Sequence, residues 1–230
     1  AWALGKLGDR AAVAPLITAL TDADAQVREM AVLGLGELRD PSAVPALAAM
    51  SSDPEHGVRS VMTVALRQIE GEPAAEALAR LVRTDGDPHT RVMAAGALGK
   101  FRSRARMPAL EAALSDPDPA VRANAACALE RIAERASVPA LLAALAHETD
   151  EEAADAMIHA LGAAGDPRAA DGLVVVLSGR VPRLRESAAA MLGKLGDERA
   201  VDPLIAATRD PDHEVRLTAV WALDALRAAH

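Results

Sequence analysis

Apolar residues recur along this chain at the spacing that places them on one face of an α-helix. Within residues 121–132, Val121, Ala125, Leu129 and Ile132 follow one another at intervals of three or four positions. A helix advances about 100° per residue, so these side chains form a single stripe that we expect to be buried. An earlier segment carries the same stripe at Val27, Ala31, Leu35 and Leu38.

The stripe belongs to a segment of about 31 residues that recurs through the chain. A repeat of this length predicts a stacked array, in which each unit buries its apolar face against its neighbours. The copies are recognised by the segments Leu4–Asp9 (LGKLGD), Leu35–Asp40 (LGELRD), Leu66–Gly71 (LRQIEG), Leu98–Ser103 (LGKFRS), Leu129–Glu134 (LERIAE), Leu161–Asp166 (LGAAGD) and Leu192–Asp197 (LGKLGD).

Each unit is predicted to hold two helices. In the unit that starts at Asp40, we expect Ser42 to cap a first helix that runs to about Met50. Residues 51–54 then break the helix, and a second helix runs from about Glu55 to Ile69. Prolines early in the first helix fit this scheme, because a missing amide donor costs little there: Pro15, Pro45, Pro108, Pro139 and Pro203.

The predicted fold class is therefore all-α, a right-handed α-solenoid of stacked antiparallel helix pairs. About seven units follow a partial first helix, and residues 1–230 form one domain. The chain is 51% hydrophobic but only 1% aromatic, which favours closely packed helices of Ala, Leu and Val. Because it opens at Ala1 inside a helical pattern, without Met, we expect it to be a fragment of a longer polypeptide.

An Asp in the turn and an Arg six residues later recur in most units. The carboxylate can accept amides at the start of the second helix, and the Arg can reach a carboxylate of its own or an adjacent unit. A feature present in nearly every unit favours stacking over a binding site. The predicted ladder comprises Asp22 and Arg28, Asp53 and Arg59, Asp85 and Arg91, Asp116 and Arg122, and Asp210 and Arg216.

These features resemble the HEAT-like repeat of the phycobilisome-lyase type. Its pattern is a proline-bearing first helix, an Asp-Pro turn, Val-Arg, a run of small residues and Ala-Leu-Gly, and Asp116–Arg122 (DPDPAVR) matches the turn. The resemblance covers essentially the whole chain. It implies that the second helices line a concave side. It also implies an adaptor or scaffold, since only a minority of relatives are lyase subunits or metal hydroxylases.

The positions one, two, five and nine after the repeat Arg point away from the predicted buried stripe, so we expect them to face solvent. Apolar side chains there favour a concave surface that binds a protein or peptide partner. The alternative is that they pack between neighbouring helices or cover the ends of the array. The predicted partner-binding residues are Trp2, Met30, Leu33, Val61, Val64, Val92, Met93, Lys100, Arg131, His159, Leu217 and Trp221.

Charge and cysteine content narrow the partners further. The formal net charge is -8, and the predicted groove mixes both signs, so we expect neither nucleic acid nor a membrane as partner. Cys127, the only cysteine, cannot form an internal disulfide, and no signal peptide is evident, which predicts a cytoplasmic protein. Arginine clusters at 102–106 and 180–185 are interpreted as solvated turns.

Two consecutive units depart from the repeat. Ala153 and Ala154 replace Val-Arg in the fifth unit, and Gly179 replaces the turn Asp in the sixth. The ladder should be interrupted there, either as neutral drift or as a flexible or specialised region.

The sequence predicts no enzymatic chemistry, metal or cofactor. The His-Glu pairs of related hydroxylases stand in second helices, whereas His147-Glu148 and His213-Glu214 stand in predicted turns. Cys127 and His159 share a groove position in neighbouring units, but no orienting third group accompanies them. The leading hypothesis is a non-enzymatic protein-binding scaffold. The alternatives are an accessory subunit of a bilin-lyase-like or other chromophore-handling enzyme, and an oligomeric structural spacer.

Overall fold

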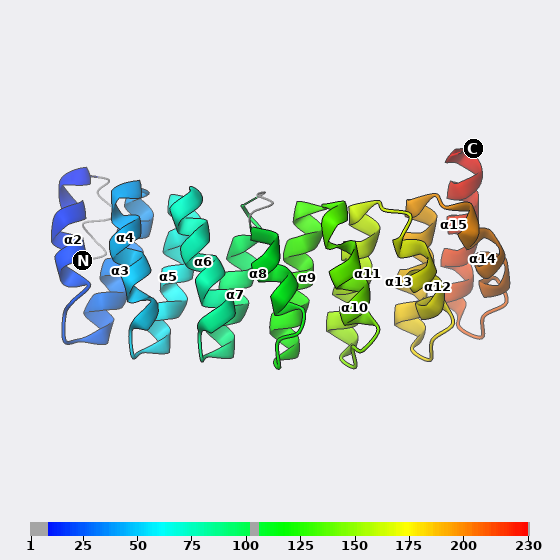
Figure 1. The fold of residues 1–230 in the computed structure, drawn as a ribbon, viewed down its shortest axis with the longest axis horizontal. Helices are drawn as coiled ribbons and strands as arrows, with labels where there is room; N and C mark the ends of the chain where they lie inside the picture. Colours follow the sequence, from blue (N-terminus) through cyan, green and yellow to red (C-terminus); the bar gives the residue numbers. More distant parts are fainter. Residues whose placement is uncertain (1–8, 102–105, 230) are drawn as a thin grey trace. The chain divides into compact units, whose positions relative to one another are not determined.

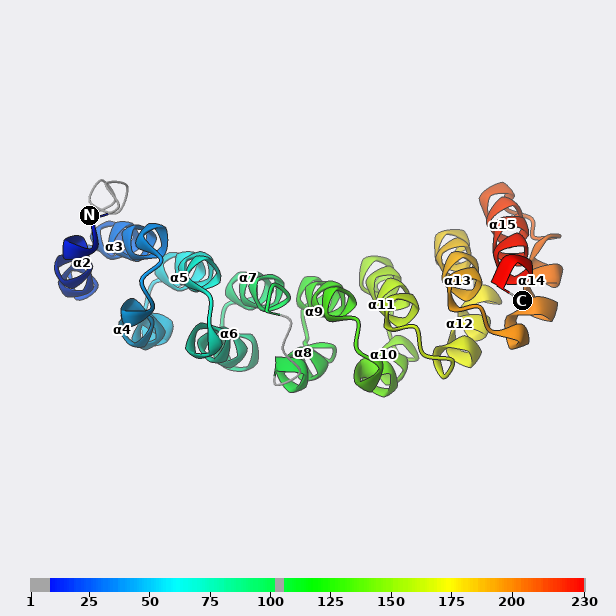
Figure 2. The ribbon, with the colours of Figure 1, turned by 90° about the horizontal axis from the view of Figure 1, so that it is seen from above.

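The computed structural model describes residues 9–101 and 106–229, and these contain helices and turns but no strand. They group into two compact units, residues 1–113 and 114–230, each a stack of antiparallel helix pairs. The fold is the α-solenoid that the repeat predicts. Figures 1 and 2 show the helices along the chain, with the first and second helices of the pairs forming two layers within each unit.

In the first unit, the second helices α3 (Ala25–Leu38), α5 (His56–Ile69) and α7 (Pro88–Leu98) form one layer. The first helices form the other layer: α2 (Val13–Ala19), α4 (Val44–Ala49), α6 (Glu72–Thr84) and α8 (Met107–Ala113). In the second unit, α9 (Pro119–Ile132), α11 (Glu151–Ala164), α13 (Pro182–Leu195) and α15 (His213–Ala229) lie opposite α10 (Val138–Leu145), α12 (Ala169–Leu177) and α14 (Val201–Ala207).

Short 3-10 turns precede several first helices, and here the predicted cap is wrong. The residue that caps η2 (Pro41–Ala43) is Asp40, whose carboxylate accepts the amide of Ser42, rather than Ser42 itself. Asp197 caps η6 (Glu198–Ala200) in the same way, by accepting the amide of Arg199. Aspartate at this position satisfies an amide that has no partner within the helix. Other 3-10 turns among the described residues are η1 (Arg10–Ala12), η3 (Met50–Ser52) and η5 (Arg135–Ser137).

The core lies between the two layers and is built mainly from the leucine of each repeat. Leu35 and Leu66 in the first unit, and Leu161 and Leu192 in the second, expose none of their surface. Glycine lets two second helices approach closely, since a Cβ on Gly36 of α3 would lie 2.8 Å from the Cα of Ala65 in α5. Gly193 of α13 faces Ala222 of α15 in the same way, at 2.7 Å.

Candidate protein-binding surface

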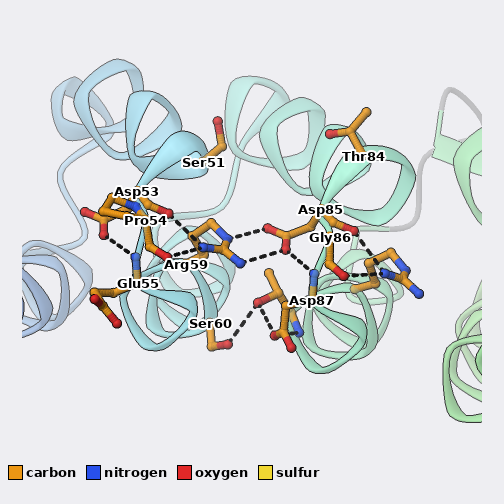
Figure 3. Close-up of polar contacts among 12 residues, drawn as sticks. Ser51, Asp53, Pro54, Glu55, Arg59, Ser60, Thr84, Asp85, Gly86 and Asp87 are labelled. Atoms are coloured by element: carbon orange, nitrogen blue, oxygen red, sulfur yellow. Dashed lines mark hydrogen bonds and ion pairs between the residues drawn. The ribbon is translucent and has the colours of Figure 1, made fainter.

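Arginines near the start of several second helices join one helix pair to the next. Arg59 donates from Nη1 to the backbone oxygens of Asp53 and Pro54, at 2.7 and 3.2 Å, and so closes its own turn. Its Nε and Nη2 donate to both carboxylate oxygens of Asp85 in the next turn, at 2.8 and 3.1 Å (Figure 3). The planar guanidinium suits this double contact, because its donors match the two oxygens of a carboxylate.

The same contact joins three further pairs of second helices. Arg28 binds Asp53, at 2.7 and 2.8 Å. Arg122 binds Glu148, at 2.6 and 2.7 Å, and Arg185 binds Asp210, at 2.8 and 2.7 Å. Each of these four arginines therefore binds the carboxylate of the adjacent repeat. In its own turn it binds backbone oxygens only. Arg91 and Arg216 also bind the backbone oxygens of their own turns, as does Arg122.

Each carboxylate of the ladder also caps the turn that it belongs to. Asp53 accepts the amide of Glu55, and Glu148 accepts the amides of Thr149 and Asp150. The hydrogen bonds from Arg122 lower the pKa of Glu148, whose side chain is only 2% exposed. The hydrogen bonds from Arg185 likewise lower the pKa of Asp210. Both carboxylates therefore stay ionised at neutral pH.

Two members of the ladder were absent from the predicted set. Arg185 was interpreted as part of a solvated arginine turn, and this is wrong, because its side chain is only 10% exposed and binds Asp210. Glu148 stands six residues before Ala154, in the place of the turn Asp. The spacing could have identified both residues, since Arg185 lies seven residues before Leu192, as Arg28 lies seven before Leu35.

The contact is missing between α11 and α13, where both partners are replaced together. Ala154 stands in the place of the Arg and Gly179 in the place of the Asp. No charge is left buried without its partner, which would be strongly destabilising. Instead, Asp155 accepts hydrogen bonds from Arg183, at 2.9 Å, and from Ser187, at 2.6 Å.

The second-helix layers carry the predicted partner-binding residues, and none of those described is fully buried. Met30 is 39% exposed and Trp221 62%. Lys100 and Arg131 are also exposed, and Trp2 lies outside the described residues. The other members are half-buried: Leu33, Val61, Val64, Val92, Met93, His159 and Leu217.

Some neighbouring positions that were expected to face solvent are buried instead. Ser60 hydrogen-bonds Thr90 of the adjacent helix at 3.1 Å, and Ala123, Ala156 and Thr218 are also buried. At Ser60 the prediction was wrong because the residue lies beside the next second helix of the stack. Small or hydroxyl side chains fit that contact. The exposed part of the layer is consequently narrower than the sequence implied.

In the first unit, the remaining face is largely apolar. Met30 and Leu33 come from α3, Val61 and Val64 from α5, and Val92 and Met93 from α7. We call these six residues the Met30–Met93 face. Lys100, in the turn after α7, pairs with Glu70 at 2.6 Å, so its charge is balanced.

The second unit presents a more polar layer. His159 lies 3.9 Å from Asp155, and Arg131 donates to the backbone oxygen of Cys127 at 3.1 Å. Burial raises the pKa of the Cys127 thiol, so the thiolate that would act as a nucleophile is disfavoured at neutral pH. Among the described residues, no three His, Cys, Asp or Glu side chains are grouped to hold a metal ion. None of the helices in the described part of the chain is both long and apolar enough to cross a membrane.

Comparison with known proteins identifies the class to which this chain belongs. A family model described as HEAT repeats matches residues 1–67, 74–162, 107–189 and 170–229. The chain therefore belongs to the HEAT-repeat family. No curated protein matches the sequence.

Solved structures show the same fold. YibA from E. coli is 16% identical over 98% of this chain and 96% of its own, with a TM-score of 0.58. An engineered protein is 22% identical over 94% of this chain and 68% of its own, with a TM-score of 0.57. Human deoxyhypusine hydroxylase, in complex with glycerol, is 22% identical over 98% of this chain and 88% of its own, with a TM-score of 0.49. At these identities the likeness to YibA and to the engineered protein concerns the fold alone.

Proposed function

We propose that this protein is a non-enzymatic scaffold of the phycobilisome-lyase type of HEAT repeat, and that it binds a protein partner on the Met30–Met93 face. The observation that carries the proposal is the contrast along α3. Leu35 and Val32 are fully buried, whereas Met30 is 39% exposed and Leu33 half-buried. A large apolar side chain in water contributes nothing to folding and gains free energy when a partner covers it.

The chemistry of the face suits a protein segment. Methionine adapts to differently shaped partners because its unbranched side chain has several rotatable bonds and a polarisable sulfur. The valines of α5 and α7 supply a stiffer apolar floor beside it. A suitable partner presents apolar side chains that cover the valines and contact Met30. It does not have to be basic or to carry phosphate, because the six residues of the face are uncharged.

Site-specific photo-crosslinking tests the proposal. A photoreactive residue in place of Met30 should capture a partner, whereas the same residue in place of Glu76 should not. Glu76 is the matched control because it is exposed, belongs to the same unit and lies in the first-helix layer on α6. In a pull-down without the photoreactive residue, Met30→Glu should abolish binding of the same partner and change the unfolding free energy by about 0.5 kcal/mol or less, as at other exposed positions.

Two outcomes would contradict the scaffold. Equal crosslinking from positions 30 and 76 would show that the Met30–Met93 face is not the contact. Absorbance of a tetrapyrrole that stays with the protein through gel filtration would instead support the chromophore-handling alternative.

A further inference from the structure

An apolar groove lies at the end of the second unit, between α14 and α15. It encloses about 390 Å³ and is lined by Val201, Ile205, Leu223 and Leu226, with Glu198 and Arg227 beside them. Ile205 is 46% exposed, and Val220, on the same helix as Leu223 and Leu226, is 44% exposed. This end of the unit therefore exposes branched apolar side chains as well as Trp221.

Comparison with the other repeats of this unit shows what normally covers such a face. The residue three positions before the repeat leucine is Ala126, Ile158 or Ala189, and each is fully buried. Val220 holds the same position before Leu223. Leu142, at the position of Ile205, lies against the next first helix, since a Cβ on Gly172 of α12 would collide with its side chain. The groove is thus the stacking face that, one repeat earlier, the following helix pair covers.

Arg216 points to the same conclusion independently. Its Nη1 binds the backbone oxygens of Asp210 and Pro211, at 2.8 and 2.9 Å, as the other ladder arginines bind their own turns. Among the described residues, however, no carboxylate contacts Arg216, and its Nη2 approaches only His213 Nδ1, at 3.5 Å. Arg122 and Arg185 use Nε and Nη2 to bind the carboxylate of the following turn.

A second polar contact joins two consecutive repeats of this unit on the side of the first helices. Arg199, in η6, binds both carboxylate oxygens of Asp171 at 3.0 Å and the backbone oxygen of Pro167 at 2.6 Å. Thirty-one residues after Asp171, the exposed Asp202 holds the corresponding position on α14. A cation on the covering helix pair would find Asp202 and the backbone oxygen of Glu198 placed for it.

We propose that the α14–α15 groove is an interaction surface for a helical hairpin of the same repeat type. The hairpin places a turn Asp or Glu on Arg216, an Arg near Asp202, and apolar side chains over Val220 and Ile205. The contact continues the internal stacking interface of the unit and is separate from the Met30–Met93 face. A second copy related by a two-fold axis does not fit, because it would present this same groove-bearing face and not the opposite face of a helix pair, which covers the groove position elsewhere in the stack.

The hairpin of this chain that already makes these contacts provides the probe. In an extended protein, residues 196–229 are repeated directly after Leu226, so that the added copy follows α15 as residues 196–229 follow Leu195. The readout is the rate of maleimide labelling of Val220→Cys, with Cys127→Ser to remove the natural thiol. Labelling at position 220 should be at least tenfold slower in the extended protein than in the original chain. Val175→Cys, which is 73% exposed on α12, is the matched control and should label equally fast in both.

The role of Arg216 is tested in the same proteins. In the extended protein, replacing the added copy of Asp210 by Ala should restore at least part of the fast labelling, and Arg216→Ala should act alike. In the original chain, Arg216→Ala should lower the unfolding midpoint less than Arg185→Ala, because only Arg185 has a carboxylate partner. Unchanged labelling at position 220 in the extended protein would overturn the proposal. Concentration-dependent sedimentation of the original chain that is abolished by Val220→Glu but unchanged by Arg216→Ala would also overturn it, by showing that a second copy covers the groove without the Arg216 contact.

Discussion

At the scale of single residues, the arginine ladder performs two tasks with one side chain. Nη1 holds the turn of its own repeat, and Nε with Nη2 holds the carboxylate of the next repeat. The carboxylate in turn caps its own turn through backbone amides. Local structure and stacking are therefore coupled, so losing one ladder residue affects both a turn and an interface.

Arg122→Ala tests this coupling at a pair whose carboxylate is almost fully buried. Loss of the guanidinium leaves Glu148 in a site where its side chain is 2% exposed, with only the amides of Thr149 and Asp150 as partners. Breaking one partner of a buried pair costs roughly 3 kcal/mol or more, and we expect about 3 kcal/mol because those amides remain. Chemical denaturation at pH 7 measures the loss.

The pH dependence of that loss has a definite sign. Arg122 lowers the pKa of Glu148 through its hydrogen bonds, so the pair stabilises the folded state above the ordinary glutamate pKa. The stabilisation disappears as the pH falls through the lowered pKa, because the protonated carboxyl no longer attracts the guanidinium. The difference between the original protein and Arg122→Ala should therefore shrink in acid. A difference that stays constant down to pH 2 would contradict the role of the charge.

At the scale of helices, stacking depends on where side chains are missing. Gly36 and Gly193 allow two second helices to contact each other through their backbones, opposite Ala65 and Ala222. At Gly162 the residue opposite is Met191, whose side chain fills the space. The pair of second helices α11 and α13 therefore differs twice from the pairs α3–α5 and α13–α15, in this contact and in the missing Arg-carboxylate pair.

Gly36→Ala separates helix propensity from packing. Propensity alone would make the change stabilising by about 1 kcal/mol, since alanine is the better helix former. The new Cβ, however, would lie 2.5 Å from Gln68 Oε1 and 2.8 Å from the Cα of Ala65, and backbone cannot yield as a flexible side chain can. Overpacking of this kind costs about 1–3 kcal/mol, so we expect a net loss of up to about 2 kcal/mol.

Gly86→Ala is the control for Gly36→Ala, because no atom lies within 4 Å of a Cβ built there. Thermal unfolding followed by circular dichroism should show a lower midpoint for Gly36→Ala and an unchanged or higher one for Gly86→Ala. Equal midpoints for the two variants would show that α3 and α5 move apart to accommodate the new methyl group without loss of stability.

At the scale of the whole molecule, the periodic part of the fold could be read from the sequence. The repeat spacing predicts helices 42–50 and 55–69, where the structure has η2, α4, η3 and then α5. The spacing also indicates an Arg and an Asp in most repeats. It could not show that Arg28 reaches Asp53 rather than Asp22, because that choice depends on how closely one pair stacks on the next.

The surface was harder to predict for the same reason. Helical angle alone places Ser60 and Met30 on one exposed face, yet Ser60 is buried against the neighbouring second helix and Met30 is not. Exposure in a stacked array depends on the neighbour as much as on the helix itself. Sequence periodicity fixes the angle of a residue on its own helix, but not the tilt and distance of the next helix.

In a stacked array, stability is approximately the sum of each repeat and its nearest-neighbour interfaces, so the weakest interface determines where the stack opens. Within the second unit, α11 and α13 lack the Arg-carboxylate pair that joins α9 to α11 and α13 to α15. Installing the pair with Ala154→Arg and Gly179→Asp should therefore slow amide hydrogen exchange in α11 and α13. Either single substitution adds a charge without its partner, so each alone should stabilise less than the pair does.

The double-mutant cycle decides whether the missing pair matters. A favourable coupling of about 1 kcal/mol or more between positions 154 and 179, together with slower exchange in α11, would show that the interface was the weak one. The Asp155 contacts to Arg183 and Ser187 lie on the same pair of helices and could already supply that stabilisation. In that case the amides of α11 and α13 would exchange at the original rate in the double variant. The absence of the Arg-carboxylate pair at this interface would then have no effect on stability.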